Sequence, residues 1–268
     1  MDDEPVSAIR PLTPAASLLA APVGVIRYLG VLGLLGVDAL SAARPSPSFL
    51  RETGRHFEGL LAMGLPLVAV VHVGMGSFLA MQAYFGATFL DGIGPVVGVG
   101  LVRNLAPLLA ALTLGGIVTA RYAADLRGIR DADGFDPARE ASGRILAAAL
   151  VGPVLAVWGA GVGIAVGFLV AHKMMGVTVP QFFDLFSEML WIRDVFGLVG
   201  KGAVFALVSA WIACHEGLHD HGPIATSVCR AACLAALGVL VLNGGSFLLL
   251  YHAGPAFGPT VLTPPTGR

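Results

Sequence analysis

The stretch of this sequence with a spacing most typical of catalysis is His215-Glu216-Gly217-Leu218-His219, the H-E-x-x-H pattern of many zinc hydrolases. In those enzymes the two histidines lie one helical turn apart, a third ligand completes the zinc site, and the glutamate activates the metal-bound water. Here the third ligand is the weak point, because Asp220 and His221 could bind only if a helix ended just before them. We therefore interpret the motif as part of a polar connection and assign no catalytic or metal-binding residue. A zinc-dependent membrane protease is kept as the alternative.

The composition indicates that the chain folds in a lipid bilayer. Of its 268 residues, 56% are hydrophobic and only 12% are charged, and the mean hydropathy is +0.82; soluble domains carry about 25% charged residues. The net charge of −1 gives no reason to expect nucleic acid as a partner. Cys214, Cys229 and Cys233 are odd in number, and the last two lie in an apolar run, so no disulfide framework is predicted. No cofactor is predicted.

Apolar segments long enough to cross a bilayer position these residues. A membrane-spanning helix needs about 20 apolar residues, and five segments meet this requirement: Gly59–Leu90, Ile93–Ala120, Ile145–Ala171, Val195–Cys214 and Ala231–Tyr251. The segment Ala15–Leu40 is also long enough, but it carries Pro22 and Arg27 near its middle, and an arginine is costly there. We expect it to lie in the membrane interface. The predicted fold is therefore an all-α integral membrane protein with an N-terminal interfacial amphipathic helix and five transmembrane helices.

The arginines of the connections predict the orientation. Arg44, Arg51 and Arg55 precede the first span, and five arginines lie between the second and third spans, so both connections are predicted to be cytoplasmic. The chain is then a multi-pass protein of the inner (plasma) membrane, with a cytoplasmic N-terminus and an extracytoplasmic C-terminus. We expect an N-terminal cytoplasmic segment with the interfacial helix (1–57), a five-span domain (58–252) and a flexible C-terminal tail (253–268).

Arg103 is the charged residue that stands out within a span. It lies about ten residues into the second span, which places it roughly 15 Å deep at 1.5 Å per residue. A charge at that depth is a candidate functional site, and the alternative is an arginine that neighbouring backbone carbonyls satisfy. Pro107 follows four residues later, and we expect it to kink the helix there. A cationic side chain beside a kink could hold a lipid headgroup.

Two features of the spans predict close packing. Gly159, Gly163 and Gly167 recur at four-residue spacing, so they share one helical face that another backbone can approach. That face could be an ordinary contact within one chain or a dimer interface. His72, in the first span, is interpreted as a buried histidine satisfied by a neighbour.

Three stretches carry a resemblance to a known family. They read "GMGSFLAMQAYFGATFL" from Gly74 to Leu90, "GVGLVRNLAPLLAALTLGGIVTARYAADL" from Gly98 to Leu126, and "DVFGLVGKGAVFALVSAWIA" from Asp194 to Ala213. Together with the five-span topology, they resemble the MlaE/YrbE permeases of Mla- and Mce-type lipid transporters, over about 240 residues. The individual motifs are short, so their order along the chain carries the resemblance.

The resemblance implies the membrane subunit of an ABC transporter that moves phospholipids or other hydrophobic lipids. Such permeases work with a second permease copy or homologue, a cytoplasmic ABC ATPase and MCE-domain proteins (MlaD or Mce). The chain has no G-x-x-x-x-G-K-[ST] motif, so it is not predicted to be an enzyme, and ATP would be hydrolysed on a partner chain.

The resemblance also implies site residues. The candidate lipid-binding residues are Met81, Gln82, Tyr84, Arg103 and Asn104. In the family the arginine is usually followed by Glu; here Asn104 takes that place, so we expect Arg103 to lack its usual charge partner. Lys201 also matches a family position, with no role assigned.

The connection between the second and third spans departs most from the family. The candidate ATPase-coupling residues are Asp125, Arg130, Asp133 and Asp136, but about eight intervening residues are missing and Gly134 replaces a Gln. We therefore expect a short coupling helix. A non-coupling scaffold permease, which only pairs with a competent partner, is the second alternative.

Overall fold

A computed structural model describes residues 14–85, 94–219 and 223–252, and all the regular elements in these ranges are helices. The tail 253–268, the end of the predicted first span and the candidate ligands Asp220 and His221 lie outside the described residues. The helices are α1 (Pro14–Ala42), α2 (Pro47–Phe85), η2 (Pro95–Val99), η3 (Leu101–Leu105), α3 (Ala106–Val118), η4 (Thr119–Ala123), α4 (Ala124–Ile129), α5 (Pro137–Met175), α6 (Val179–Met189), α7 (Ile192–Leu218) and α8 (Ile224–His252).

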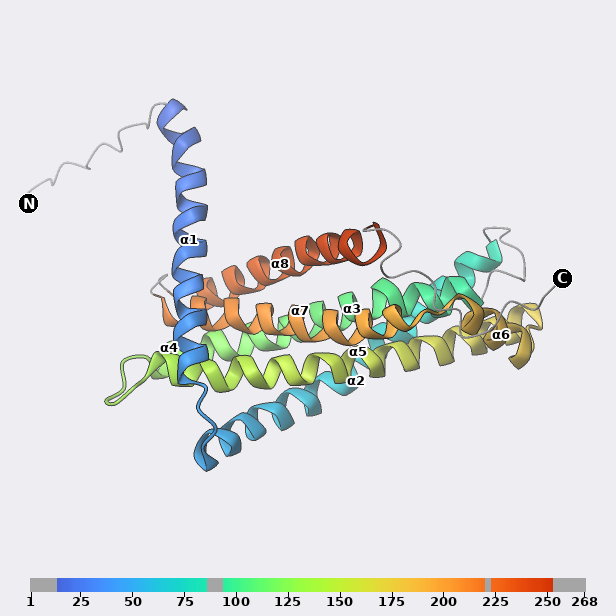
Figure 1. Cartoon of the computed structure of the whole chain (residues 1–268), viewed down its shortest axis with the longest axis horizontal. Coiled ribbons are helices and arrows are strands. Elements are labelled where there is room, and N and C mark those ends of the chain that lie inside the picture. Colours follow the sequence, from blue (N-terminus) through green and yellow to red (C-terminus); the bar gives the residue numbers. More distant parts are fainter. Residues whose placement is uncertain (1–13, 86–93, 220–222, 253–268) are drawn as a thin grey trace, which may run out of the picture.

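The long helices form a bundle with one helix lying across it. The stretch from η2 to α4 is continuous, and it runs along the bundle with α2, α5, α7 and α8, whereas α1 crosses the bundle near α4 (Figure 1). Within the described ranges, six helices are long and apolar enough to cross a membrane, and α1 is among them. Five of the six run along the bundle, as predicted, and the crosswise direction of α1 fits the predicted interfacial helix.

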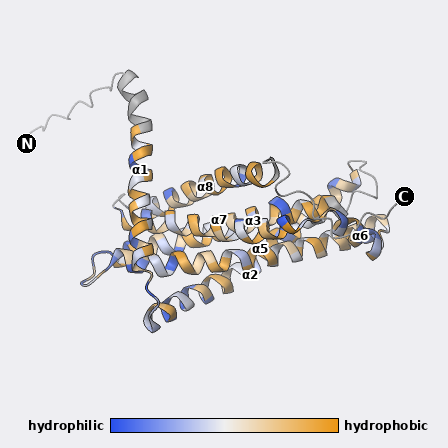
Figure 2. Ribbon diagram, in the orientation of Figure 1, coloured by the Kyte–Doolittle hydropathy of each residue, from blue (hydrophilic) through white to orange (hydrophobic). Residues whose placement is uncertain are grey.

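The outward surface of the bundle is apolar. Hydrophobic colouring runs along the bundle helices (Figure 2), and large apolar side chains such as Val70, Phe78, Val157 and Leu240 are exposed. In water such a surface would be unfavourable, because each buried CH₂ group gains about 0.8 kcal/mol. The surface therefore matches lipid as the surrounding medium.

Each helix along the bundle extends beyond the predicted span at one or both ends. The third predicted span, Ile145–Ala171, is the middle of α5, and the fourth, Val195–Cys214, is the middle of α7. Charged residues end an apolar run but not a helix, and capping residues determine where the helix stops. Asp136 accepts hydrogen bonds from the backbone N–H groups of Ala138 and Arg139 at the start of α5, and Gly176, with φ of 69°, ends it.

The short helix α6 was not predicted. Thr178 and Gln181 form a capping box at its start, and Phe182, Phe183 and Phe186 pack together along it. Spacings of three and four residues between apolar side chains indicate a helix, so the signal is present in the sequence between the third and fourth predicted spans.

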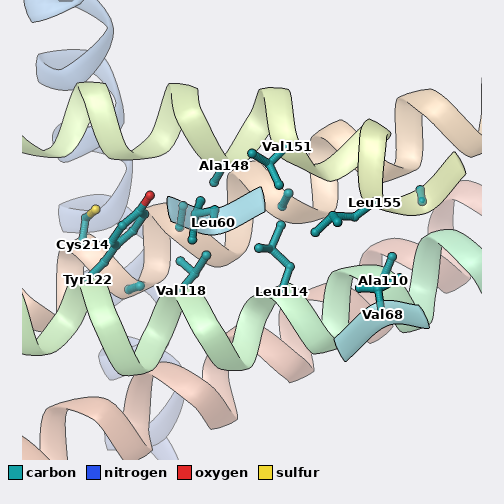
Figure 3. Close-up of a cluster of buried hydrophobic side chains, with 14 of the residues drawn as sticks. Leu60, Val68, Ala110, Leu114, Val118, Tyr122, Ala148, Val151, Leu155 and Cys214 are labelled. Atoms are coloured by element: carbon teal, nitrogen blue, oxygen red, sulfur yellow. The ribbon is translucent and has the colours of Figure 1, made fainter. Parts of the chain in front are cut away.

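The core lies where α2, α3, α5 and α7 meet. Figure 3 shows side chains from these helices packed together, with Leu60 from α2, Leu114 from α3 and Leu155 from α5 among the fully buried ones. Much of this packing depends on close helix crossings.

Glycines make these crossings possible, and they settle the question of the glycine face of α5. A Cβ atom at Gly76 of α2 would collide with the backbone of Gly163, and one at Gly159 would lie 2.5 Å from the His72 ring. The glycine face therefore packs within the chain. His72 is buried there, with its Nδ1 2.8 Å from the Val68 carbonyl oxygen, as predicted.

Candidate functional site

The H-E-x-x-H motif is helical as far as Leu218 and buried from His215 to Gly217, so its interpretation as a connecting loop is wrong. His215 to Leu218 form the last turn of α7, and Glu216 is fully buried. Its Oε2 accepts a hydrogen bond of 3.0 Å from Nε of Arg230 on α8, and the Nδ1 atom of His219 lies 2.8 Å from the His215 carbonyl oxygen of the same helix. Apolar residues carried the predicted span only to Cys214, which is why the continuation of the helix was missed.

Nothing in this arrangement supports a zinc hydrolase site. No group of three or more His, Cys, Asp or Glu side chains that could hold a metal ion occurs among residues 14–85, 94–219 and 223–252. One carboxylate oxygen of Glu216 accepts from Arg230 on the next helix, and the other lies 3.4 Å from the His215 Nδ1. The carboxylate is therefore already engaged by side chains of the protein.

Arg103 has a charge partner, contrary to the expectation based on Asn104. The Arg103 Nε lies 3.1 Å from Oδ1 of Asp194, which is fully buried at the start of α7. The Arg103 guanidinium also donates to the Met189 carbonyl at 2.9 Å and lies over the Trp191 ring. The partner is 91 residues away in sequence, so replacing the neighbouring Glu by Asn104 did not leave the arginine alone.

Lys201 forms a structural hydrogen bond with the backbone near Pro107. In an α-helix a proline leaves the carbonyl four residues earlier without its usual N–H donor. For Pro107 that carbonyl belongs to Arg103, and Nζ of Lys201 donates to it at 2.9 Å. At this point the π-helical turn η3 is followed directly by α3, with Pro107 in its first turn; the kink stays a prediction. A side chain of α7 therefore supports the interrupted backbone that carries Arg103.

An apolar groove separates α7 from the C-terminal half of α8. It has a volume of about 680 Å³, and the two helices diverge towards this end in Figure 1. Apolar residues such as Phe196, Val204 and Leu249 line most of it, and Arg193 and Lys201 are the cations on its α7 side. The Arg193 guanidinium lies 3.7 Å from the centre of the Trp191 ring. A groove with an apolar length and a cationic end has the amphipathic character of a lipid.

The other predicted lipid-binding residues lie near the end of α2. Gln82 and Tyr84 are exposed, and Met81 is partly buried. The neighbouring residues Ala80 and Ala83 pack in one buried cluster with Leu101 and Val97, so this end of α2 lies beside the helix that carries Arg103. Asn104, next to Arg103, is partly buried.

The predicted coupling residues lie at the opposite end of the bundle. Asp125, on the six-residue helix α4, is 4.0 Å from Arg121, and Arg130 pairs with Asp131 at 3.0 Å. Asp133 is exposed in the turn that follows, and Asp136 caps α5. Residues 130–136 contain no helix of their own, and α4 continues the second long helix. A coupling helix in this connection stays a prediction.

A model of the family described as Permease MlaE matches residues 53–246. This range runs from the first turns of α2 into the second half of α8, and it includes Arg103, Lys201 and most of the groove. The chain belongs to the MlaE permease family.

Similar proteins agree with this assignment. This MlaE-family chain is 26% identical over 226 residues to a probable ABC transporter permease protein of Rickettsia typhi, covering 80% of this chain and 87% of that protein. It is 25% identical over 246 residues to the intermembrane phospholipid transport system permease protein MlaE of Haemophilus influenzae, covering 84% and 92%. It is also 22% identical over 198 residues to the chloroplast protein TRIGALACTOSYLDIACYLGLYCEROL 1 of Arabidopsis thaliana, covering 69% and 57%.

These matches confirm the resemblance drawn from the three sequence stretches. The MlaE-family chain is a multi-pass membrane protein and a permease subunit of an ABC transporter family rather than an enzyme. Its family implies an ATPase partner. The protease alternative has no support from the family or from the environment of Glu216.

Proposed function

We propose that this permease moves phospholipids or other hydrophobic lipids between the membrane and a conduit of MCE-domain proteins, driven by a separate cytoplasmic ATPase. The observation that carries the proposal is the groove between α7 and α8, which combines an apolar length with Arg193 and Lys201. An anionic phosphate would lie against the two cations, and an acyl chain would follow the apolar wall around Val204 and Leu242. The name of the Haemophilus influenzae relative supports a phospholipid as the substrate.

The charges around the groove favour an anionic headgroup. Arg103, Arg193 and Lys201 gather around Trp191 and the Asp194 carboxylate. Hydrogen bonds between such cations and a phosphate are about twice as strong as neutral ones. In this proposal Arg103 and Asn104, with Met81, Gln82 and Tyr84 on α2, border the headgroup end of the path.

The arginines at one end of the bundle support the proposed orientation and the side on which the ATPase binds. The start of α2, α4 and the turn 130–136 lie at this end (Figure 1), and they contain Arg51, Arg55, Arg127 and Arg130. We place this end in the cytoplasm, where Asp125, Arg130, Asp133 and Asp136 would face the ATPase. A second permease copy or homologue would complete the transporter, with the MCE proteins on the other side of the membrane.

The scaffold alternative has one observation in its favour. Residues 130–136 form a turn rather than a helix that could dock on an ATPase. In a non-coupling scaffold the chain would pair with a competent permease, and its own α4 end would not need to bind an ATPase.

Purification of the transporter from its native membrane tests the proposal. We expect an ATPase and MCE-domain proteins to co-elute with the chain, phospholipid to be extracted with it, and vesicles containing the complex to transfer labelled phospholipid only with ATP. Co-elution of a permease homologue with no ATPase bound to this chain would favour the scaffold. A complex that transfers no lipid with ATP would refute the proposal.

Substitution of two lysines tests whether the lipid binds in the groove. Lys201→Met removes a cation from the groove, whereas Lys173→Met removes an exposed cation near the end of α5. Loss of one charge-assisted contact, about 1.4 kcal/mol, corresponds to about tenfold weaker retention of an anionic lipid. We expect this loss for Lys201→Met but not for Lys173→Met, measured as lipid per protein by mass spectrometry. The loss should persist in the double variant Lys201→Met with Pro107→Ala, because a backbone donor then replaces the structural hydrogen bond of Lys201 but not its charge. Equal retention in both variants would place the lipid elsewhere.

A further inference from the structure

The last turn of α7 joins three other helices at the α4 end of the bundle. Arg127 of α4 donates to the His219 carbonyl at 3.2 Å, and Arg230 of α8 donates to Glu216 at 3.0 Å. The ring of Tyr28 on α1 packs edge-on against the His215 ring, with centroids 4.8 Å apart. The motif that resembled a zinc site is therefore the point where α1, α4 and α8 meet α7.

An ion pair of this junction links α7 to the start of α8. Glu216 has no exposed side-chain surface, whereas the Arg230 side chain is 48% exposed. A buried carboxylate is costly without a cation beside it, so Glu216 holds Arg230, and with it the first turns of α8, in one place. Ser227, one turn before Arg230, is also fully buried against the bundle.

The rest of α8 is held much less firmly. In its most apolar stretch only 11% of the residues are buried, against 50% in that of α7. Its C-terminal half, with Val241, Leu242 and Leu249, forms one wall of the groove. A helix fixed at one end and thinly packed at the other can tilt about the fixed end, because few contacts oppose the movement. A small rotation at Arg230 would then become a larger displacement at the groove.

We propose that the Glu216–Arg230 pair transmits movement of the α4 segment to α8 and thereby changes the width of the groove between α7 and α8. The path runs from Arg127 through the end of α7 at His219, through the one turn that leads back to Glu216, and across to Arg230. Both residues act as positioning residues, since neither lines the groove. This inference rests on the proposed function, in which the α4 end meets the ATPase and the groove holds the lipid.

The test compares lipid transfer with ATP hydrolysis in the intact complex. The complex is purified with its co-eluting ATPase from membranes that carry each variant, and it is placed in phosphatidylethanolamine and phosphatidylglycerol vesicles. Transfer of labelled phospholipid and release of phosphate are measured on the same sample, and their ratio is the readout. A merely structural defect lowers both quantities together, whereas a coupling defect lowers the ratio.

Arg230→Gln and Arg230→Lys form the decisive pair, because they differ mainly in charge. We expect Arg230→Gln to lower the ratio about fivefold or more, in the range of typical coupling between sites, and Arg230→Lys to keep most of it. Glu140→Gln is the matched control: Glu140 pairs with Arg144 at the same end of the bundle, and both residues of this ion pair belong to α5, although the Arg144 guanidinium also lies over the Tyr122 ring of η4. Its ratio should equal that of the unaltered complex.

Each outcome decides the matter. Equal ratios in Arg230→Gln, Arg230→Lys and the unaltered complex would overturn the inference, and so would an equal fall in Glu140→Gln. If Arg230→Gln does not assemble, Glu216→Gln gives the answer, because it leaves no buried carboxylate unpaired, and an unchanged ratio there would overturn the inference as well. Failure of the unaltered complex to transfer lipid would instead contradict the proposed function.

Discussion

Replacing Lys201 by methionine tests whether its ammonium group substitutes for the backbone donor that Pro107 lacks. Lys201 Nζ donates to the Arg103 carbonyl, the group that the N–H of residue 107 would reach in an α-helix. Pro107→Ala restores that N–H. The two substitutions should therefore compensate each other, because either donor can satisfy the carbonyl.

The expected free-energy change follows from the hydrogen bond between Lys201 and the Arg103 carbonyl. A hydrogen bond from a charged group contributes about 1.5–3 kcal/mol, and one between neutral groups about 1 kcal/mol. Lys201→Met alone also removes the cost of burying an ammonium group, so its net effect is a difference between opposing contributions. A double-mutant cycle cancels these separate contributions. We expect Pro107→Ala to stabilise the Lys201→Met variant by about 1 kcal/mol more than it stabilises the unaltered chain.

The assay is reversible unfolding in mixed detergent micelles, followed by loss of helical circular dichroism. Pro66→Ala is the control, because Pro66 lies inside α2 and its missing N–H concerns a different carbonyl. It should combine additively with Lys201→Met. Independent substitutions add within about 0.5 kcal/mol. A coupling free energy below this value between positions 107 and 201 would therefore refute the reasoning.

Two further predictions concern packing and capping. Gly152→Ala should sharply lower the yield of folded protein, because its Cβ would collide with the Gly202 carbonyl of α7. Gly161→Ala on the same helix meets open space and should stabilise the chain by up to about 1 kcal/mol. Equal yields of the two variants in membrane extracts would contradict the close crossing of α5 and α7. Asp136→Ala should destabilise the chain by about 0.5–2 kcal/mol through loss of the α5 cap, measured by the same unfolding assay. Asp133→Ala, in the exposed turn, should change stability by less than about 0.5 kcal/mol, and similar losses in both variants would argue against the cap.

Apolar runs predicted the helices of the bundle well and their ends poorly. The run from Val195 to Cys214 located α7, but the helix continues through Glu216, because hydropathy reports the membrane and not the backbone hydrogen bonds. The same limit produced the wrong interpretation of the H-E-x-x-H motif as a loop. Asp136 was predicted as a coupling residue, and its observed contact is a helix cap; a function at the ATPase remains a prediction.

The sequence by itself determined the medium, the number of long helices and the family, because lipid imposes long apolar runs that composition reveals and short motifs mark the family along the chain. Only the tertiary structure decided which charges meet. Arg103 with Asp194, Lys201 with the Arg103 carbonyl, and Glu216 with Arg230 each join different helices. In a bilayer a charged group must find a partner inside the protein, and which partner it finds depends on how the helices pack, which local sequence does not specify.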